Sequence, residues 1–187
     1  MSGAAASAPL VVRLETERLL LRPLQHGDED ALFALFGDPQ VMRYWNTPPW
    51  VDPARASAMI ASDAEAAADG SALRLGIVPL GAGTVVGTVS LFALDHANRR
   101  GEVGYALRYD CWGRGYATEA VGALVRWAFG ELGLHRLEAD IDPRNTASAA
   151  VLTRLGFRLE GVLRERWFVA GEVSDSAMYG LLAHEVP

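Results

Sequence analysis

The segment at residues 110–119 constrains this chain more than any other, and it reads Asp-Cys-Trp-Gly-Arg-Gly-Tyr-Ala-Thr-Glu. An alternating apolar segment, Val103–Leu107, precedes it. After it, apolar residues recur at three- and four-residue spacing through residues 117–132, which is the period of a helix. The sequence therefore predicts a strand, a small-residue turn and a helix in direct succession.

Two glycines give this turn a chemical meaning. The first N–H groups of a helix have no intrahelical acceptors, and the helix dipole places partial positive charge at that end. Gly113 and Gly115 remove side-chain bulk and permit positive φ, so several N–H groups can converge on one anion. A diphosphate cradle is one interpretation of the turn, and an ordinary glycine-rich connection is the other.

Length and composition predict a single domain. The chain has 187 residues, 50% of them hydrophobic, which is enough to bury a core. We expect the domain at residues 10–187 and an Ala- and Ser-rich disordered tail at residues 1–9. The tail has neither basic residues nor a long apolar run, which argues against a signal peptide or a membrane span. Cys111 is the only cysteine, so no intramolecular disulfide forms, and we expect a cytoplasmic protein.

Net charge and metal-ligand residues exclude two classes of function. The net charge of −6 argues against a nucleic-acid partner, because such proteins concentrate positive charge. An acidic protein suits a cationic substrate such as an amine, although moderate negative charge is also common among soluble proteins. No metal site is expected, since one cysteine and scattered histidines do not form a ligand set; the histidines are His26, His96, His135 and His184.

Periodicity and turn residues predict the other elements. Strands are expected at residues 11–24, 73–79, 84–94 and 134–141, and a terminal hairpin at residues 157–168 and 172–182. Helices are expected to begin at Asp28, Pro53 and Asn145, with Asp28 and Asn145 as side-chain caps and Pro53 at the first helical position. Strands interleaved with helices predict an α/β domain with a mixed sheet.

Four segments occur in the order typical of a known enzyme family. They are Gly-Glu-Val-Gly-Tyr at residues 101–105, Trp-Gly-Arg-Gly-Tyr-Ala-Thr-Glu-Ala at 112–120, Asn-Thr-Ala-Ser at 145–148 and Leu-Gly-Phe at 155–157. Together they resemble the GCN5-related N-acetyltransferase (GNAT) superfamily, and most closely its ribosomal-protein N-terminal acetyltransferase branch. The resemblance covers residues 15–182 and implies a single-domain fold, with a mixed, mostly antiparallel sheet of about seven strands and about four helices.

The resemblance implies that the turn binds the pyrophosphate of acetyl-CoA, the acetyl donor. In the family, a bulge separates the central strand from its neighbour and frees backbone groups that bind the pantetheine arm. The sequence of the corresponding strand in this chain, around residues 105–107, gives no sign of a bulge. The family often has Gln or Arg where this chain has Trp112, which matters little if backbone N–H groups bind the pyrophosphate. The expected cofactor-binding residues are Tyr105, Ala106, Leu107, Trp112, Gly113, Arg114, Gly115, Tyr116, Ala117, Thr118 and Asn145.

Acyl transfer from a thioester to an amine needs a base for the amine and an acid for the departing thiolate. Glu102 precedes Gly104 on the strand that enters the turn, and the resemblance implies that it acts as the base, through a water molecule. Asp95 and Asp140 are weaker substitutes. The resemblance likewise implies that Ser148 is the acid. The alternatives are an exposed strand carboxylate and a hydroxyl that bonds to backbone.

The acceptor is expected to be a primary amine that reacts in a ternary complex, most simply a protein N-terminal α-amine. A small amine such as an antibiotic or amino acid derivative is the alternative within this class. The expected acceptor-binding residues are Tyr44, Trp45, Trp50 and Trp167. The alternative for the aromatic loop at residues 44–50 is a buried staple between helices.

A non-catalytic acyl-CoA-binding module is the competing interpretation from another class of protein. The sequence also leaves the oligomeric state open. Apolar residues on the terminal hairpin either form a homodimer contact or complete the core; they include Leu163, Phe168 and Val169.

Overall fold

A computed structural model describes residues 8–186 of the chain. Residues 1–7 of the expected tail lie outside the described residues, and residues 8 and 9 have no regular secondary structure. The first described residues that belong to the core are Leu10 and Val12.

The centre of the molecule is an eight-stranded sheet with the order β1-β2-β3-β4-β5-β6-β8-β7. Each pair of neighbours is antiparallel except β5 and β6, which are parallel. The strands are β1 (Leu14–Glu15), β2 (Leu19–Pro23), β3 (Leu73–Pro79), β4 (Gly87–Asp95), β5 (Arg100–Leu107), β6 (Arg136–Ile141), β7 (Arg158–Val169) and β8 (Glu172–Leu182). This is the mixed, mostly antiparallel sheet that the family resemblance implies, with eight strands where about seven were expected. The strand expected at residues 11–24 is divided into two antiparallel strands, β1 and β2.

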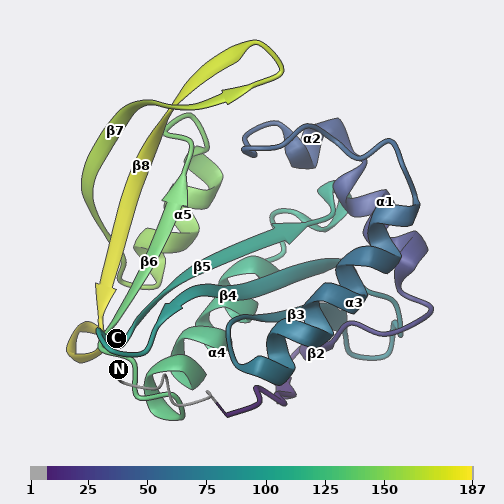
Figure 1. Cartoon of the computed structure of the whole chain (residues 1–187), viewed down its shortest axis with the longest axis horizontal. Coiled ribbons are helices and arrows are strands. Elements are labelled where there is room, and N and C mark those ends of the chain that lie inside the picture. The colour runs from purple at the N-terminus through teal and green to yellow at the C-terminus, as the bar shows by residue number, and fades with distance from the viewer. Residues whose placement is uncertain (1–7, 187) are drawn as a thin grey trace, which may run out of the picture.

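Helices cover both faces of the sheet (Figure 1). They are α1 (Glu29–Phe36), α2 (Pro39–Met42), α3 (Ala54–Asp69), α4 (Tyr116–Gly130) and α5 (Thr146–Arg154). One core cluster contains the apolar side of α4, with Val121 and Leu124 fully buried, and Leu152 of α5. A second cluster joins α1, α2 and α3 to the opposite face of the sheet, through residues such as Leu32 and Ile60.

Two local expectations about helix ends need correction. Asp28 precedes α1, but its side chain does not cap the helix; it accepts hydrogen bonds from both terminal nitrogens of Arg22 instead. Pro53 lies one position before the first residue of α3 rather than at it. A second short helix, α2, follows α1 directly and is capped by Asp38, whose carboxylate accepts a hydrogen bond from the Gln40 N–H at 2.8 Å.

The central strands separate partway along the sheet. β5 pairs with β6 only over Arg100–Glu102, opposite Arg136–Glu138, and the two strands then diverge (Figure 1). On its other side, β5 keeps its pairing with β4 up to Leu107, with a register shift between Phe92 and Asp95 of β4. Residues 103–107 of β5 therefore have one side free of any strand partner among residues 8–186.

The bulge lies in β4, where Ala93 has φ of 49°. Non-glycine residues rarely adopt this left-handed conformation, and no glycine or proline in that segment signals it.

Within residues 8–186, none of the helices combines the length and apolar character that a membrane crossing requires.

Candidate active site

Two cavities meet at the opening between β5 and β6. The first, which we call the turn cavity, has a volume of about 520 Å³ and lies beside the 110–119 turn and the start of α5. The second, the sheet cavity, has a volume of about 420 Å³ and reaches across β5, β4 and β3 toward α1 and α3. Both cavities share five lining residues: Tyr44, Trp45, Tyr105, Asn145 and Ser148.

The turn has the geometry of an anion cradle. Gly113 and Gly115 have φ of 73° and 80°, and Gly115 is the N-cap of α4 without any side-chain cap. The first backbone bond at this end runs from the Glu119 N–H to the Gly115 carbonyl, at 3.1 Å. The N–H groups that precede it have no acceptor within the helix, and the residues Gly115–Thr118 line the turn cavity.

An ion-pair cluster fixes the turn to the start of the sheet. Glu119 accepts hydrogen bonds from the Thr16 hydroxyl at 2.6 Å and from Nε of Arg18 at 2.7 Å. Arg18 also donates to the Arg114 carbonyl at 2.9 Å. Burial favours a higher pKa for Glu119, but these hydrogen bonds and the Arg18 charge hold its pKa below the usual value. The carboxylate stays ionised near neutral pH and holds the turn in place.

The two cavities differ in the charge of their linings. Two arginines, Arg144 and Arg154, line the turn cavity, and its described lining contains no carboxylate. Three carboxylates line the sheet cavity, together with Arg74 and Arg166; the carboxylates are Glu102, Asp140 and Asp142. The turn cavity therefore suits an anion such as a diphosphate, and the sheet cavity suits a cation.

Trp112 and Arg114 take different positions in the turn. The Trp112 indole donates a hydrogen bond to the Leu107 carbonyl at 2.7 Å, which closes the end of β5, and its ring lines the turn cavity. Arg114 donates back to the Asp110 carbonyl at 3.0 Å, and its side chain is not among those that line the cavity. Arg114 can therefore contribute to anion binding through its backbone, not through its charge.

The start of α5 lies across the opening from β5. The Asn145 carboxamide accepts a hydrogen bond from the Ser148 N–H at 3.1 Å, so the predicted cap is present. The Tyr105 hydroxyl donates to the Ser148 carbonyl at 3.2 Å and bridges β5 to α5. Burial raises the pKa of Tyr105 to about 12, so this phenol stays protonated and acts as a strut, not as a base.

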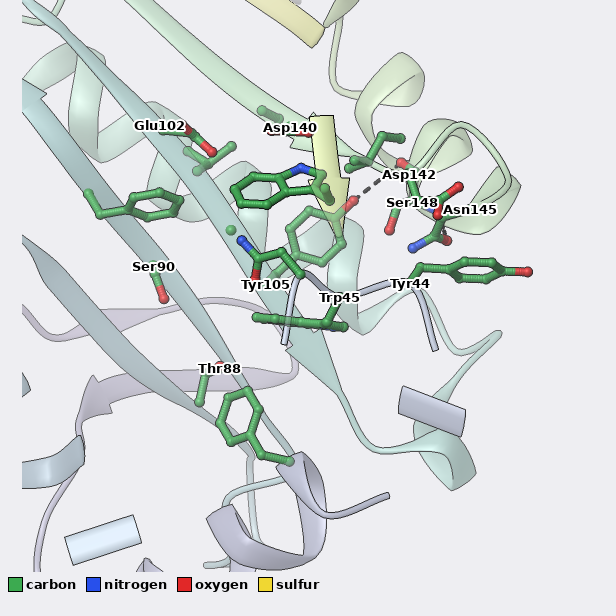
Figure 2. A pocket seen from close by; sticks show the side chains of 18 of the residues that line it. Tyr44, Trp45, Thr88, Ser90, Glu102, Tyr105, Asp140, Asp142, Asn145 and Ser148 are labelled. Atoms are coloured by element: carbon green, nitrogen blue, oxygen red, sulfur yellow. Dashed lines mark hydrogen bonds between the residues drawn. The ribbon is translucent and has the colours of Figure 1, made fainter. Parts of the chain in front are cut away.

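Glu102 lies on β5 inside the sheet cavity, half-buried (Figure 2). Burial raises its pKa, and the nearby charges of Asp140 and Glu138 raise it further, against the opposing effect of Arg166. In Figure 2, Tyr105 lies between Glu102 on one side and Ser148 and Asn145 on the other. Glu102, the expected base, thus lines the same cavity as Ser148, the expected acid.

Asp140 is held by two neighbours, whereas Asp95 lies elsewhere. The Ser176 hydroxyl donates to Asp140 Oδ1, and Nε of Arg166 lies 3.4 Å from Asp140 Oδ2. Asp95 accepts hydrogen bonds from Asn98 at the far end of β4 and is not among the residues that line the sheet cavity. Of the two substitute bases, only Asp140 is near Glu102.

The far wall of the sheet cavity is polar. Arg74 donates from Nε to the Ser90 hydroxyl at 3.1 Å and from Nη1 to both oxygens of Asp63, at 2.9 and 3.0 Å. Burial raises the pKa of Asp63, in spite of the Arg74 charge. Thr88 completes this wall as a buried hydroxyl.

The expected aromatic residues divide between the cavities and the core. Tyr44 and Trp45 line both cavities, and Trp167 lines the sheet cavity. Trp50 is only 7% exposed; it stacks on Phe36 with ring centroids 4.8 Å apart. Trp50 is therefore part of a buried aromatic staple and not of the acceptor site in which it was expected.

Two small residues of β5 line the cavities. Gly104 lines the sheet cavity, and a Cβ on Gly104 would lie 3.1 Å from the Phe92 ring. Gly104 therefore makes room first for Phe92. Ala106 lines the turn cavity and is also packed in the second core cluster.

Sequence reasoning missed the charged residues that come from distant parts of the chain. Arg74, Arg154 and Arg166 line the cavities, but none lies in a recognisable motif. The pairing of β3 with β4 places Arg74 here, and the pairing of β7 with β8 places Arg166, whereas Arg154 is the last residue of α5. Alternation along β3 could have indicated Arg74, since it is polar between the buried Leu73 and Leu75.

Comparison with known proteins agrees with this geometry. Residues 18–158 match the profile of the acetyltransferase (GNAT) domain. The uncharacterised N-acetyltransferase p20 of Bacillus licheniformis is 38% identical over 92% of this chain and 97% of its own length. The putative ribosomal N-acetyltransferase YdaF of Bacillus subtilis is 38% identical over 55% of this chain and 56% of its own. The spermidine N(1)-acetyltransferase of Escherichia coli is 26% identical over 88% of this chain and 86% of its own length.

A solved structure extends the likeness to a protein with bound cofactor. The structure of Mycobacterium smegmatis RimJ in complex with CoA-disulfide superimposes with a TM-score of 0.80. It is 27% identical in sequence and covers 90% of this chain and 84% of that one. The cradle, the open strand pair and the basic lining of the turn cavity fit the pyrophosphate and pantetheine of CoA. This chain therefore belongs to the GNAT family, as an acetyl-CoA-dependent N-acetyltransferase.

Proposed function

We propose that the acceptor is a protein N-terminal α-amine, and that acetyl-CoA and this amine react directly in a ternary complex. The observation that carries the proposal is the meeting of two cavities of opposite lining charge at Ser148, Asn145 and Tyr105. A thioester that enters from the turn cavity and an amine that enters from the sheet cavity would meet at this junction. No side chain has to carry the acetyl group between them.

The reaction needs an uncharged amine. An N-terminal α-amine has an unperturbed pKa of about 8, compared with about 10.4 for lysine. A larger fraction of it is therefore uncharged near neutral pH, and a weaker base can remove its proton. Glu102, with its raised pKa, is better matched to accept this proton through a water molecule than an ordinary glutamate is. The amine nitrogen then forms a bond to the acetyl carbon, and the carbon–sulfur bond breaks. In our proposal the Ser148 hydroxyl protonates the departing thiolate and is itself reprotonated by the proton that the nitrogen loses as the amide forms.

The walls of the sheet cavity support an acceptor that extends out of the protein. The loop after α2 and the β7–β8 hairpin stand on either side of the diverging strands (Figure 1). Tyr44 and Trp45 from the loop and Trp167 from the hairpin line the cavity between them. Asn46 at its edge is exposed, so a chain attached to the amine has a path to solvent.

A small polyamine is the second candidate acceptor. The observation in its favour is the set of three carboxylates in the sheet cavity, together with the likeness to a spermidine N(1)-acetyltransferase. This candidate shares the donor, the base and the acid with the first and differs only in the charge of the acceptor.

The test is an acceptor panel with acetyl-CoA and detection of products by mass spectrometry. The panel holds short peptides with a free N-terminus and no lysine, the same peptides with a blocked N-terminus and one lysine, spermidine, and an aminoglycoside. We expect acetylation of the free N-terminus at the highest kcat/KM. Faster turnover of spermidine or the aminoglycoside would overturn the choice of acceptor. Acetyl-CoA binding without turnover of any amine would favour a non-catalytic module.

A further inference from the structure

Arg166 is a cation inside a cavity that we assign to a cationic substrate. Its side chain lines the sheet cavity, with Nε 3.4 Å from Asp140 Oδ2 and the guanidinium carbon 5.6 Å from the centre of the Trp167 ring. The side chain is 40% exposed, so a cavity ligand can approach it. Its charge also reaches Glu102, since it opposes the rise in the pKa of that carboxyl.

The backbone of β7 is shaped to place Arg166 there. Consecutive residues of a strand normally point to opposite faces, yet Arg166 and Trp167 both line the sheet cavity. The pairing of β7 with β8 shifts between Leu163 and Trp167, which lie opposite Ser176 and Ser174. β7 thus carries two more residues than β8 in this interval, a bulge of the kind that redirects side chains.

The irregular segment combines backbone strain with one contact that holds it in place. Glu165 has φ of 53°, a conformation that a non-glycine residue adopts at a cost. Its N–H donates to the Asp175 carboxylate on β8 at 2.8 Å. A regular strand would need neither feature.

The charge balance of the sheet cavity depends on Arg166. Asp142 is paired with Arg144 at 2.6 Å, and Arg74 is paired with Asp63. Glu102 and Asp140 are the carboxylates that remain. With Arg166 against Asp140, the cavity keeps the negative charge of a single carboxylate, Glu102, for an incoming cation.

We propose that Arg166 is a specificity-determining residue that restricts the acceptor site to amines with one positive charge and excludes di- and polyamines. A protein N-terminus next to an uncharged segment satisfies this restriction. A polyamine would place its second ammonium among Asp140, Trp167 and the guanidinium of Arg166, where like charges repel. This proposal rests on the assignment of the sheet cavity to the acceptor, and it narrows the acceptor class.

The test compares two probes that differ by one charge, n-butylamine and 1,4-diaminobutane, as ligands of the CoA-bound protein. Calorimetric titration with Arg166→Gln should show diaminobutane binding about tenfold or more tighter than in the unaltered protein, from the loss of one nearby like charge. The affinity for butylamine should change by about threefold or less. Arg164→Gln removes the same charge from an exposed position on the same strand, outside the cavity lining, and should change neither affinity.

Equal changes for the two probes, or none for diaminobutane, would overturn the proposal. Equally tightened binding of diaminobutane to Arg164→Gln would also overturn the proposal, because the effect would then follow from the net charge of the protein. Binding to the CoA complex is measured without turnover. Failure of the acceptor panel to show acetylation would therefore refute the proposed function separately, while the ratio of the two affinities still decides the role of Arg166.

Discussion

Substitution of Glu102 by Gln separates catalysis from cofactor binding. The side chain is half-buried on β5, and no hydrogen bond or ion pair holds it among the contacts of residues 8–186. Its pKa is raised by burial and by Asp140 and Glu138. General-base assistance is worth about 10²- to 10⁴-fold in rate. We therefore expect Glu102→Gln to lower kcat by about that factor.

The pH profile gives the sharper readout. Activity should rise with pH as Glu102 loses its proton, and because its pKa is raised, this limb should lie above the pH range of a free glutamate. In Glu102→Gln the limb should disappear from the residual activity. The calorimetric affinity for acetyl-CoA should stay the same, since Glu102 lines the sheet cavity and not the turn cavity.

The same substitution has an expected effect on stability. A glutamate whose folded pKa lies above its unfolded pKa destabilises the fold once it is ionised, so the cost is present above the folded pKa and absent below the unfolded one. Glu102→Gln should therefore raise Tm near pH 8 and leave it unchanged near pH 4. A variant with unaltered kcat, or with a Tm change of the same size at both pH values, would refute the assignment of Glu102.

Three further predictions concern other parts of the molecule. Gly115→Glu should abolish measurable acetyl-CoA binding through steric block and repulsion of the diphosphate, whereas Gly133→Glu, also at positive φ but in an open turn, should keep it; equal loss in both would mean that backbone strain is the cause. Ser148→Ala should lower kcat by about 10²-fold with little change in KM for acetyl-CoA, and Thr153→Ala, which removes another hydroxyl of α5, should keep full activity. Phe168 is 74% exposed on β7, and we propose that it contributes to a homodimer contact; light scattering should then show a dimer that Phe168→Asp dissociates, and a monomeric unaltered protein would contradict this.

The parts of the fold that depend on local sequence could be predicted. The Asn145 cap follows from a side chain that bonds the N–H three residues later, and the β7–β8 turn follows from Ala170 and Gly171, both at positive φ. The cradle was predicted for the same reason, because a helix start exposes N–H groups wherever it occurs. Such features need only a few consecutive residues.

The parts of the fold that depend on contacts between residues far apart in sequence could not be predicted. Asp28 was expected to cap α1, but Arg22 on β2 competes for its carboxylate with two hydrogen bonds. Trp50 was expected in the acceptor site, although an aromatic residue in a loop can equally pack in the core. Only its stacking on Phe36 distinguishes these two positions. Arg166 enters its cavity through a bulge whose residues carry no special signature in the sequence.

The short pairing of β5 with β6 has a consequence for the order of events in catalysis. Beyond Glu102 no strand ladder joins β6, β7 and β8 to the rest of the sheet within residues 8–186. Those strands carry Asp140, Arg166 and Trp167, whereas Glu102 lies on β5 at the last position that pairs with β6. Their spacing from the rest of β5 can therefore change with whatever fills the opening between β5 and β6, and the pantetheine arm would fix the distance between the two halves of the acceptor site.

We accordingly expect compulsory-order kinetics, with acetyl-CoA bound before the amine. Product-inhibition patterns measure this directly: CoA should compete with acetyl-CoA at every amine concentration, and the acetylated product should not. Random-order patterns would mean that the two halves hold their spacing without the ligand. If the order is compulsory, the donor substrate also acts as a structural brace that assembles the site for its own acceptor.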